Sequence, residues 1–171
     1  MQGDLAFKRR DVRTLRPGEW LNDEVVNFWM GLLQAREQPA GLPPKVHLCS
    51  SFFWAKFMEG GKPSFRRVQR WTTPERGLGY SLLDCELVFV PINWENNHWV
   101  SCCINLRSER LEYFDSLGGY GRHVLENLAY YIEQEAEARG QALDTSNWQR
   151  VSAPCPQQNN WCARLPDDTL I

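Results

Sequence analysis

Three short apolar stretches in the middle of the chain constrain its fold more than any other feature. Residues 87–92, 99–104 and 111–114 have the length and the β-branched and aromatic content of buried strands. The last two flank a loop at residues 105–108, which makes them the arms of an antiparallel hairpin. A small, mainly antiparallel sheet is therefore expected at the centre of the protein.

The hairpin also predicts which residues face each other. A loop of residues 105–108 pairs Ile104 with Glu109, and the same register places His98 opposite Asp115. An imidazole and a carboxylate would then meet at one end of the sheet, where the carboxylate can orient the ring and stabilise its charged form. A register shift of one or two residues would loosen this contact.

Helical periodicity flanks the strands on both sides. Apolar residues three and four positions apart predict a helix at residues 23–36, with Asn22 or Asp23 as its N-terminal cap. The same spacing of apolar residues between positions 124 and 132 marks a second amphipathic helix, which is expected to end before Gly140. The expected fold class is α+β, with helices flanking the central sheet.

Other segments complete this layout. The aromatic stretch at residues 48–57 favours a helix, although its periodicity is ambiguous, and residues 148–153 favour a last strand. Trp29 and Trp54 are expected in the hydrophobic core. Because 171 residues lie within the usual size of one domain and show no internal repeat, residues 1–171 are expected to form a single domain.

Composition narrows the class of partner and the compartment. Hydrophobic residues make up 43% of the chain without a long apolar run, which gives no indication of a membrane span. The net charge of -2 gives no support for nucleic-acid binding, so protein or peptide partners are favoured. The six cysteines lack CxxC or zinc-finger spacing, and the N-terminus lacks a signal peptide. An intracellular protein with reduced thiols, rather than a secreted one, is expected.

Four residues have the chemistry of a cysteine hydrolase in a workable order. His98 can accept the proton of a thiol, Asp115 can orient the ring, Gln158 can donate to an oxyanion, and Cys162 can attack an amide. Each also has an ordinary interpretation: a strand-end histidine, a turn aspartate, a solvated amide and an inert thiol. Only their joint occurrence favours an active site.

The chain resembles the ubiquitin-like-protein proteases that process and remove SUMO, the sentrin-specific proteases. The motifs that carry the resemblance lie at residues 15–28, 70–72, 90–93, 98–99, 113–117 and 155–160. The resemblance implies a papain-like cysteine protease fold, with His98 as general base, Asp115 as its orienter and Gln158 in the oxyanion hole. It also implies that Trp20 and Trp99 enclose the diglycine tail of the modifier and that Asp23 lies on the binding surface.

The end of the chain departs from the family pattern. In that pattern an Asp-Cys-Gly motif places the nucleophile six residues after the oxyanion glutamine, where this chain has Arg164, whereas Cys162 comes two residues earlier. The domain is therefore expected to be truncated after the segment of Gln158. Three hypotheses stay open: a SUMO protease that uses Cys162, an inactive form that only binds the modifier, and a related acetyltransferase. The resemblance further implies a monomer of nuclear location that needs no metal or organic cofactor, with SUMO or a related modifier and its conjugates as partners.

Overall fold

The computed structural model describes residues 8–37, 45–76 and 78–157. Its helices are α1 (Arg9–Arg13), α2 (Asp23–Glu37), α3 (Phe52–Phe57), α4 (Phe65–Val68) and α5 (Arg122–Glu137), with short 3-10 helices at Gln69–Trp71, Pro74–Arg76 and Leu82–Asp84. Its strands are β1 (Val46–Leu48), β2 (Leu87–Trp94), β3 (His98–Asn105), β4 (Arg110–Phe114) and β5 (Gln149–Ser152).

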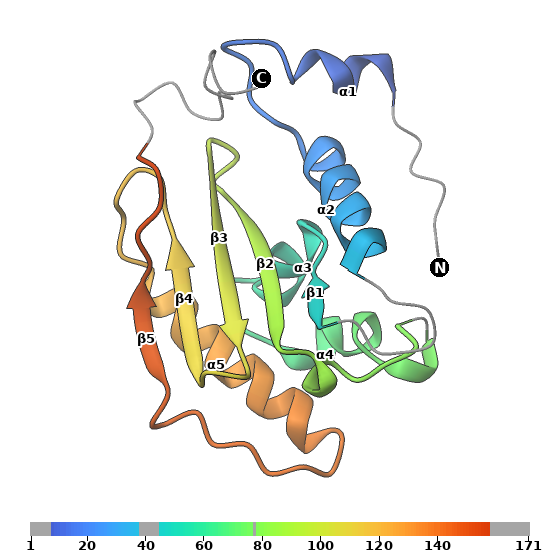
Figure 1. The fold of residues 1–171 in the computed structure, drawn as a ribbon, viewed down its shortest axis with the longest axis vertical. Helices are drawn as coiled ribbons and strands as arrows, with labels where there is room; N and C mark the ends of the chain where they lie inside the picture. The colour runs from blue at the N-terminus through green and yellow to red at the C-terminus, as the bar shows by residue number, and fades with distance from the viewer. Residues whose placement is uncertain (1–7, 38–44, 77, 158–171) are drawn as a thin grey trace.

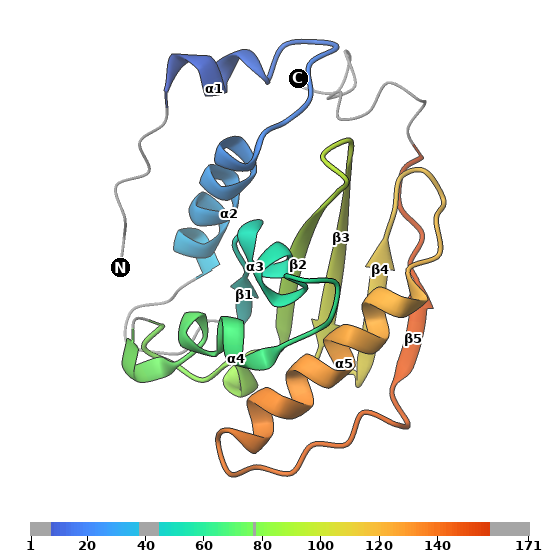
Figure 2. The ribbon, with the colours of Figure 1, turned by 180° about the vertical axis from the view of Figure 1, so that it is seen from behind.

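The strands form one sheet in the order of the sequence, β1-β2-β3-β4-β5 (Figure 1). The two central pairings, β2 with β3 and β3 with β4, are antiparallel, whereas the outer pairings, β1 with β2 and β4 with β5, are parallel. Helices α3 and α5 lie across one face of the sheet, and α2 lies beside its β1 edge (Figure 2). The expected α+β class with an antiparallel centre and flanking helices is confirmed.

The core lies between the sheet and the helices on that face. Alternate residues of β2 and β3 are buried there, and α5 contributes the apolar residues whose spacing predicted it: Val124, Leu125, Leu128, Tyr131 and Ile132. Because these side chains recur three and four positions apart, they form one continuous stripe against the sheet. The expected second helix is confirmed, as is the last strand, β5.

Helix α2 confirms the first predicted helix but corrects one expected core residue. Asn22 caps it, because its Oδ1 accepts a hydrogen bond from the Val25 N–H at 3.0 Å. Trp54 is buried at 7% exposure, but Trp29 is 58% exposed. The prediction for Trp29 was wrong because α2 packs beside the short edge strand β1 rather than across the sheet, so little of the helix surface is covered.

The helix expected at residues 48–57 is shorter than predicted. Only Phe52–Phe57 is helical, and the preceding β1 pairs parallel with β2. The Cys49 N–H also donates to the Phe89 carbonyl at 2.8 Å. Its partner strand is distant in sequence, so local periodicity could not indicate this pairing.

The hairpin forms, but its predicted register was wrong by two residues. Ile104 lies opposite Leu111 rather than Glu109, because Asn105 is still paired with Arg110 in the ladder. The Asn105 side chain then caps the turn by accepting the Ser108 N–H at 2.9 Å. A shift of two keeps every side chain on its expected face, since strand side chains alternate with a period of two.

Candidate active site

His98 and Asp115 come together at one end of the sheet. His98 is the first residue of β3 and Asp115 follows the last residue of β4. Extending the observed register puts Asp115 across from Val100, so that His98 is its diagonal neighbour on the same face. The two side chains span this diagonal: His98 Nε2 lies 2.7 Å from Asp115 Oδ1, and the side chains are only 12% and 8% exposed.

A set of donors holds the Asp115 carboxylate in place. The Leu117 N–H donates to Oδ1 at 2.8 Å and the Gly119 N–H donates to Oδ2 at 3.0 Å, while the Tyr113 hydroxyl lies 3.5 Å from Oδ2. Burial by itself raises the pKa of Asp115, but the Leu117 N–H, the contact with His98 and the Gly119 N–H outweigh it and lower this pKa below its ordinary value. The carboxylate therefore stays ionised at neutral pH.

Two glycines leave the space that this arrangement needs. A Cβ at Gly119 would lie 2.2 Å from Asp115 Oδ2, and a Cβ at Gly121 would lie 2.2 Å from the Tyr113 ring. Gly118 adopts a φ of +74°, which L side chains rarely tolerate. The turn after Asp115 thus packs its backbone directly against the Asp115 carboxylate and against the ring of Tyr113 in β4.

The contact through Nε2 assigns the chemistry of the His98 ring. When Nε2 carries the hydrogen that is donated to Asp115, Nδ1 bears the lone pair of the neutral imidazole. Nδ1 is then the atom that can accept a proton from a thiol, and Asp115 stabilises the imidazolium that results. The pair can act as a general base and its orienter.

Trp99 joins this end of the sheet to the segment before α2. Its indole Nε1–H donates to the Leu21 carbonyl at 2.9 Å, which fixes the residue next to Trp20. Trp20 itself is 45% exposed. Asp23, at the start of α2, accepts a hydrogen bond from the buried Ser51 hydroxyl at 2.8 Å. The two tryptophan positions are thereby linked, although their binding roles, and that of Asp23, stay predictions.

The described thiols offer few candidates for a nucleophile. Cys49, Cys85, Cys102 and Cys103 are buried, and burial raises the pKa of each, to about 12 for Cys85 and Cys103. These four are protonated and inert at neutral pH. Among the described cysteines, Cys155 is the partly exposed one, and all five are free of disulfides.

Gln158 and Cys162 lie outside the described residues, so their roles stay predictions. The last described residue, Gln157, nevertheless lies beside the loop of Asp115. Gln157 Nε2 lies 3.5 Å from the Asp115 carbonyl and 3.2 Å from that of Cys155. The residue before Gln158 is therefore in contact with the loop that carries the carboxylate.

A family model described as the Ulp1 protease family, C-terminal catalytic domain, matches residues 19–162. The chain belongs to the Ulp1 protease family. Its His98–Asp115 pair and the linked tryptophans lie inside the matched residues.

Curated members of the family are similar over most of this chain. The ubiquitin-like-specific protease ESD4 of Arabidopsis thaliana is 40% identical over 153 residues, which cover 87% of this chain and 31% of that protein. Sentrin-specific protease 2 of Homo sapiens is 37% identical over 160 residues, which cover 91% of this chain and 26% of that protein. The chain thus spans about a third or less of the length of these relatives.

Solved structures of the family have the same fold. A SUMO protease Ulp1 with its catalytic cysteine oxidised to a sulfinic acid superposes with a TM-score of 0.77 at 26% identity, covering 94% of this chain and 68% of the other. The Ulp1 protease domain in complex with Smt3, the yeast orthologue of SUMO, gives a TM-score of 0.72 at 24% identity, covering 92% and 72%. The expected fold is confirmed.

Two contacts that support the candidate site were not predicted from the sequence. Helix α1 was not predicted, yet its buried Asp11 accepts a hydrogen bond from Asn22 Nδ2 at 3.0 Å and so holds the start of α2. The support of Asp115 by Gly119 was also missed. Its signal was visible in the Asp-Ser-Leu-Gly-Gly run, because an aspartate before glycines favours a turn in which the carboxylate accepts backbone N–H groups.

Two further findings bear on cofactors and membranes. Across residues 8–37, 45–76 and 78–157, no group of three or more His, Cys, Asp or Glu side chains is placed to hold a metal ion. None of the helices in that part of the chain is long and apolar enough to span a bilayer.

Proposed function

We propose that this chain is a cysteine peptidase that hydrolyses the bond after the C-terminal diglycine of SUMO or a related ubiquitin-like modifier. The same chemistry would serve maturation of the modifier precursor and its removal from conjugates. The observation that carries the proposal is the 2.7 Å contact of His98 Nε2 with Asp115 Oδ1 within a fold of the Ulp1 family. The relatives named as ubiquitin-like-specific and sentrin-specific proteases support the choice of substrate.

In the proposed reaction, His98 Nδ1 takes the proton of the Cys162 thiol, and the thiolate attacks the carbonyl carbon after the second glycine. The side-chain amide of Gln158 donates to the oxyanion that develops. The imidazolium, stabilised by Asp115, then protonates the leaving amine, and water hydrolyses the thioester. No metal or organic cofactor enters these steps.

The substrate tail is proposed to run between Trp20 and Trp99. Two glycines carry no side chains, so aromatic rings can close over an extended backbone while bulkier residues are excluded. The hydrogen bond from Trp99 to the Leu21 carbonyl supports this placement, because it keeps the segment of Trp20 against β3. Asp23 is proposed to lie on the surface that contacts the body of the modifier.

A second candidate function is binding of the modifier without hydrolysis. The described cysteines favour it, because four of the five are buried with raised pKa values and cannot replace a nucleophile. The chain would then grip the modifier through Trp20, Asp23 and Trp99 while Cys162 stays idle.

One experiment separates the two functions. Single-turnover cleavage of a C-terminal fluorogenic amide of SUMO would be measured for the chain, for Cys162→Ser and for His98→Ala, with SUMO binding measured in parallel. Cys155→Ser is the matched control, since Cys155 is the partly exposed thiol among the described residues. Cleavage that is lost in the first two variants and kept in the control supports hydrolysis. Binding without cleavage supports the second function, and absence of both refutes the proposal.

The remaining expectations stay predictions that rest on the family resemblance. They are an intracellular and nuclear location, a monomeric state and a single domain. Fractionation of cells that express the tagged chain tests the first, and sedimentation of the purified chain tests the second.

A further inference from the structure

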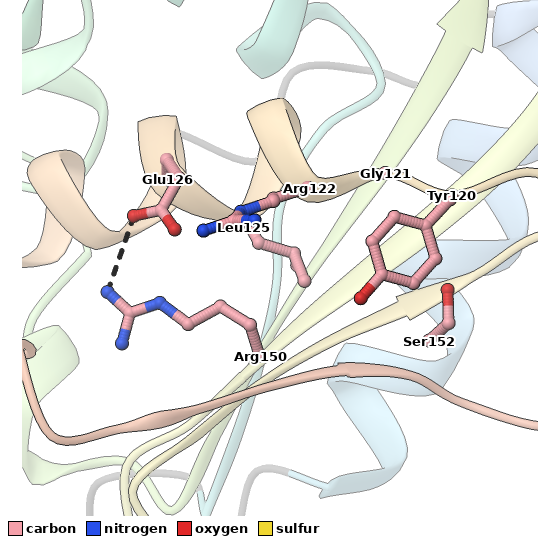
Figure 3. A pocket seen from close by; sticks show the side chains of 7 residues that line it. All are labelled: Tyr120, Gly121, Arg122, Leu125, Glu126, Arg150 and Ser152. Atoms are coloured by element: carbon pink, nitrogen blue, oxygen red, sulfur yellow. Dashed lines mark hydrogen bonds and ion pairs between the residues drawn. The ribbon is translucent and has the colours of Figure 1, made fainter.

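A cavity of about 240 Å³ lies between the start of α5 and the edge strand β5, on the side of the sheet away from β1 (Figure 3). Its walls combine two guanidinium groups, one carboxylate, two hydroxyls and an apolar floor, contributed by Tyr120, Gly121, Arg122, Leu125, Glu126, Arg150 and Ser152. Of these residues, only Gly121 also packs against the proposed hydrolase site, where its lack of a side chain leaves room for the Tyr113 ring.

The neighbouring strand β5 has an open edge. Among the described elements, none lies beyond β5 in either view of the fold (Figures 1 and 2). The N–H groups of Gln149 and Ala153 donate to carbonyls of the β4 side, at 3.0 and 2.8 Å. Because backbone groups alternate in direction along a parallel strand, Arg150 and Ser152 direct their N–H and C=O groups outward. These two residues also line the cavity.

The charge of the cavity is unbalanced. Arg150 is satisfied, because it donates to the Trp148 carbonyl at 2.7 Å and forms an ion pair with Glu126 at 3.5 Å. The exposed Arg122 has no hydrogen bond or ion pair to any residue within the described ranges. Arg122 also begins α5, where the helix dipole adds to the positive potential. The cavity therefore carries one uncompensated positive charge beside unpaired backbone groups.

We propose that an extended, acidic segment of a partner protein adds to the sheet along β5. Its backbone pairs with the outward groups of Arg150 and Ser152, and its alternate side chains enter the cavity. One of them places a carboxylate against the guanidinium of Arg122. Such strand addition obtains affinity from the main chain and specificity from the pocket.

Charge favours an acidic partner over a second copy of this chain. Residues Gln149–Ser152 carry no acidic side chain. Pairing of two copies along β5 would bring like charges from Arg122 and Arg150 of both chains together, which is unfavourable across paired strands. An acidic strand neutralises Arg122 instead.

The test uses the full chain and a fluorescein-labelled peptide of alternating valine and glutamate, with anisotropy as the readout. We expect saturable binding that is weakened at least about tenfold by Arg122→Glu, because a charge-assisted hydrogen bond is replaced by repulsion. The matched control is Arg66→Glu on α4, an exposed arginine that also lacks a described partner; it should leave binding unchanged. Ser152→Pro removes one outward N–H while sparing the hydrogen bonds to β4, and should weaken binding as well.

Several results would overturn the proposal. The proposal is wrong if a valine–lysine peptide binds as tightly as the acidic peptide, or if the acidic peptide binds with a dissociation constant above about 1 mM. It is also wrong if Arg66→Glu and Arg122→Glu weaken binding equally. Dimerisation of the chain that Ser152→Pro abolishes would show instead that a second copy occupies the edge. Circular dichroism of each variant establishes that the fold is intact. Because the readout is binding, loss of hydrolase activity does not affect the outcome.

Discussion

Gly119 determines where the Asp115 carboxylate lies, so one added methyl group there should displace it. In Gly119→Ala the new Cβ would lie 2.2 Å from Oδ2 and 3.3 Å from Cγ. The φ of Gly119 lies outside the left-handed region, so alanine fits the backbone and the effect is steric. To reach an ordinary contact the carboxylate must move by about 1 Å. The 2.7 Å hydrogen bond to His98 cannot survive such a shift.

A displacement of this size should slow the reaction strongly and change the stability of the fold little. Misplacing a catalytic group by about 1 Å costs roughly 10²-fold in rate, or about 2.7 kcal/mol in activation free energy. The kcat/KM for a fluorogenic SUMO amide measures this loss. The imidazole Nε2 proton of His98, seen by ¹⁵N-edited NMR, reports the hydrogen bond whether or not the chain turns over substrate. Its downfield resonance should disappear in Gly119→Ala.

Gly118→Ala provides the matched control. Its Cβ would meet only Gln157 Oε1 at an ordinary 3.4 Å, but its φ of +74° makes alanine strained. This variant should lose roughly 1 kcal/mol of stability and keep the His98 resonance. If Gly119→Ala keeps both the resonance and the activity, the reasoning about the carboxylate is refuted.

Three further predictions concern stability. Burial lowers the pKa of His47 to about 4. Between about pH 6.5 and 4 the imidazole therefore binds a proton in the unfolded chain but not in the folded one. The free energy of unfolding should fall by up to about 3 kcal/mol as the pH drops through that window. Urea unfolding of His47→Gln should lack most of this slope, and an unchanged slope would contradict the assignment. Arg139 Nη2 lies 2.6 Å from Oε1 of the fully buried Glu135. Arg139→Met leaves that carboxylate buried without its ion pair and should lower the free energy of unfolding by about 3–5 kcal/mol. The double variant with Glu135→Leu should recover much of this loss of stability. Trp54→Ala should cost about 3–5 kcal/mol and Trp29→Ala about 0.5 kcal/mol; equal losses in thermal melts would contradict the observed exposures.

The secondary structure near the candidate site was largely predictable, and the errors have identifiable causes. Helix α5 and strands β2 to β4 followed from periodicity, because their buried faces repeat along the sequence. The register of the hairpin was wrong because Asn105 still pairs with Arg110 in the ladder, so that the turn begins one residue later than the loop composition indicated. The contact of His98 with Asp115 still formed, since a slip of two residues preserves the face of each side chain.

Residues whose environment depends on distant segments could not be predicted in the same way. The exposure of Trp29 reflects the position of α2 at the edge of the sheet. The parallel strand β1 depends on a partner some forty residues away in the sequence. In both cases the local pattern was compatible with more than one packing, and tertiary contacts selected one.

The sequence by itself determined the α+β layout, the family and the juxtaposition of His98 and Asp115. The layout and the juxtaposition follow from local periodicity and from a hairpin whose arms are close in the chain, whereas the family follows from the motifs that the chain shares with it. Only the tertiary structure decided that Nε2 of His98 contacts the carboxylate, that the Gly119 backbone holds it, and that Trp99 ties Leu21 to the sheet. The physical reason is that hydrogen bonds and close contacts depend on distances of a few tenths of an ångström between segments, whereas periodicity specifies only which face of an element is buried.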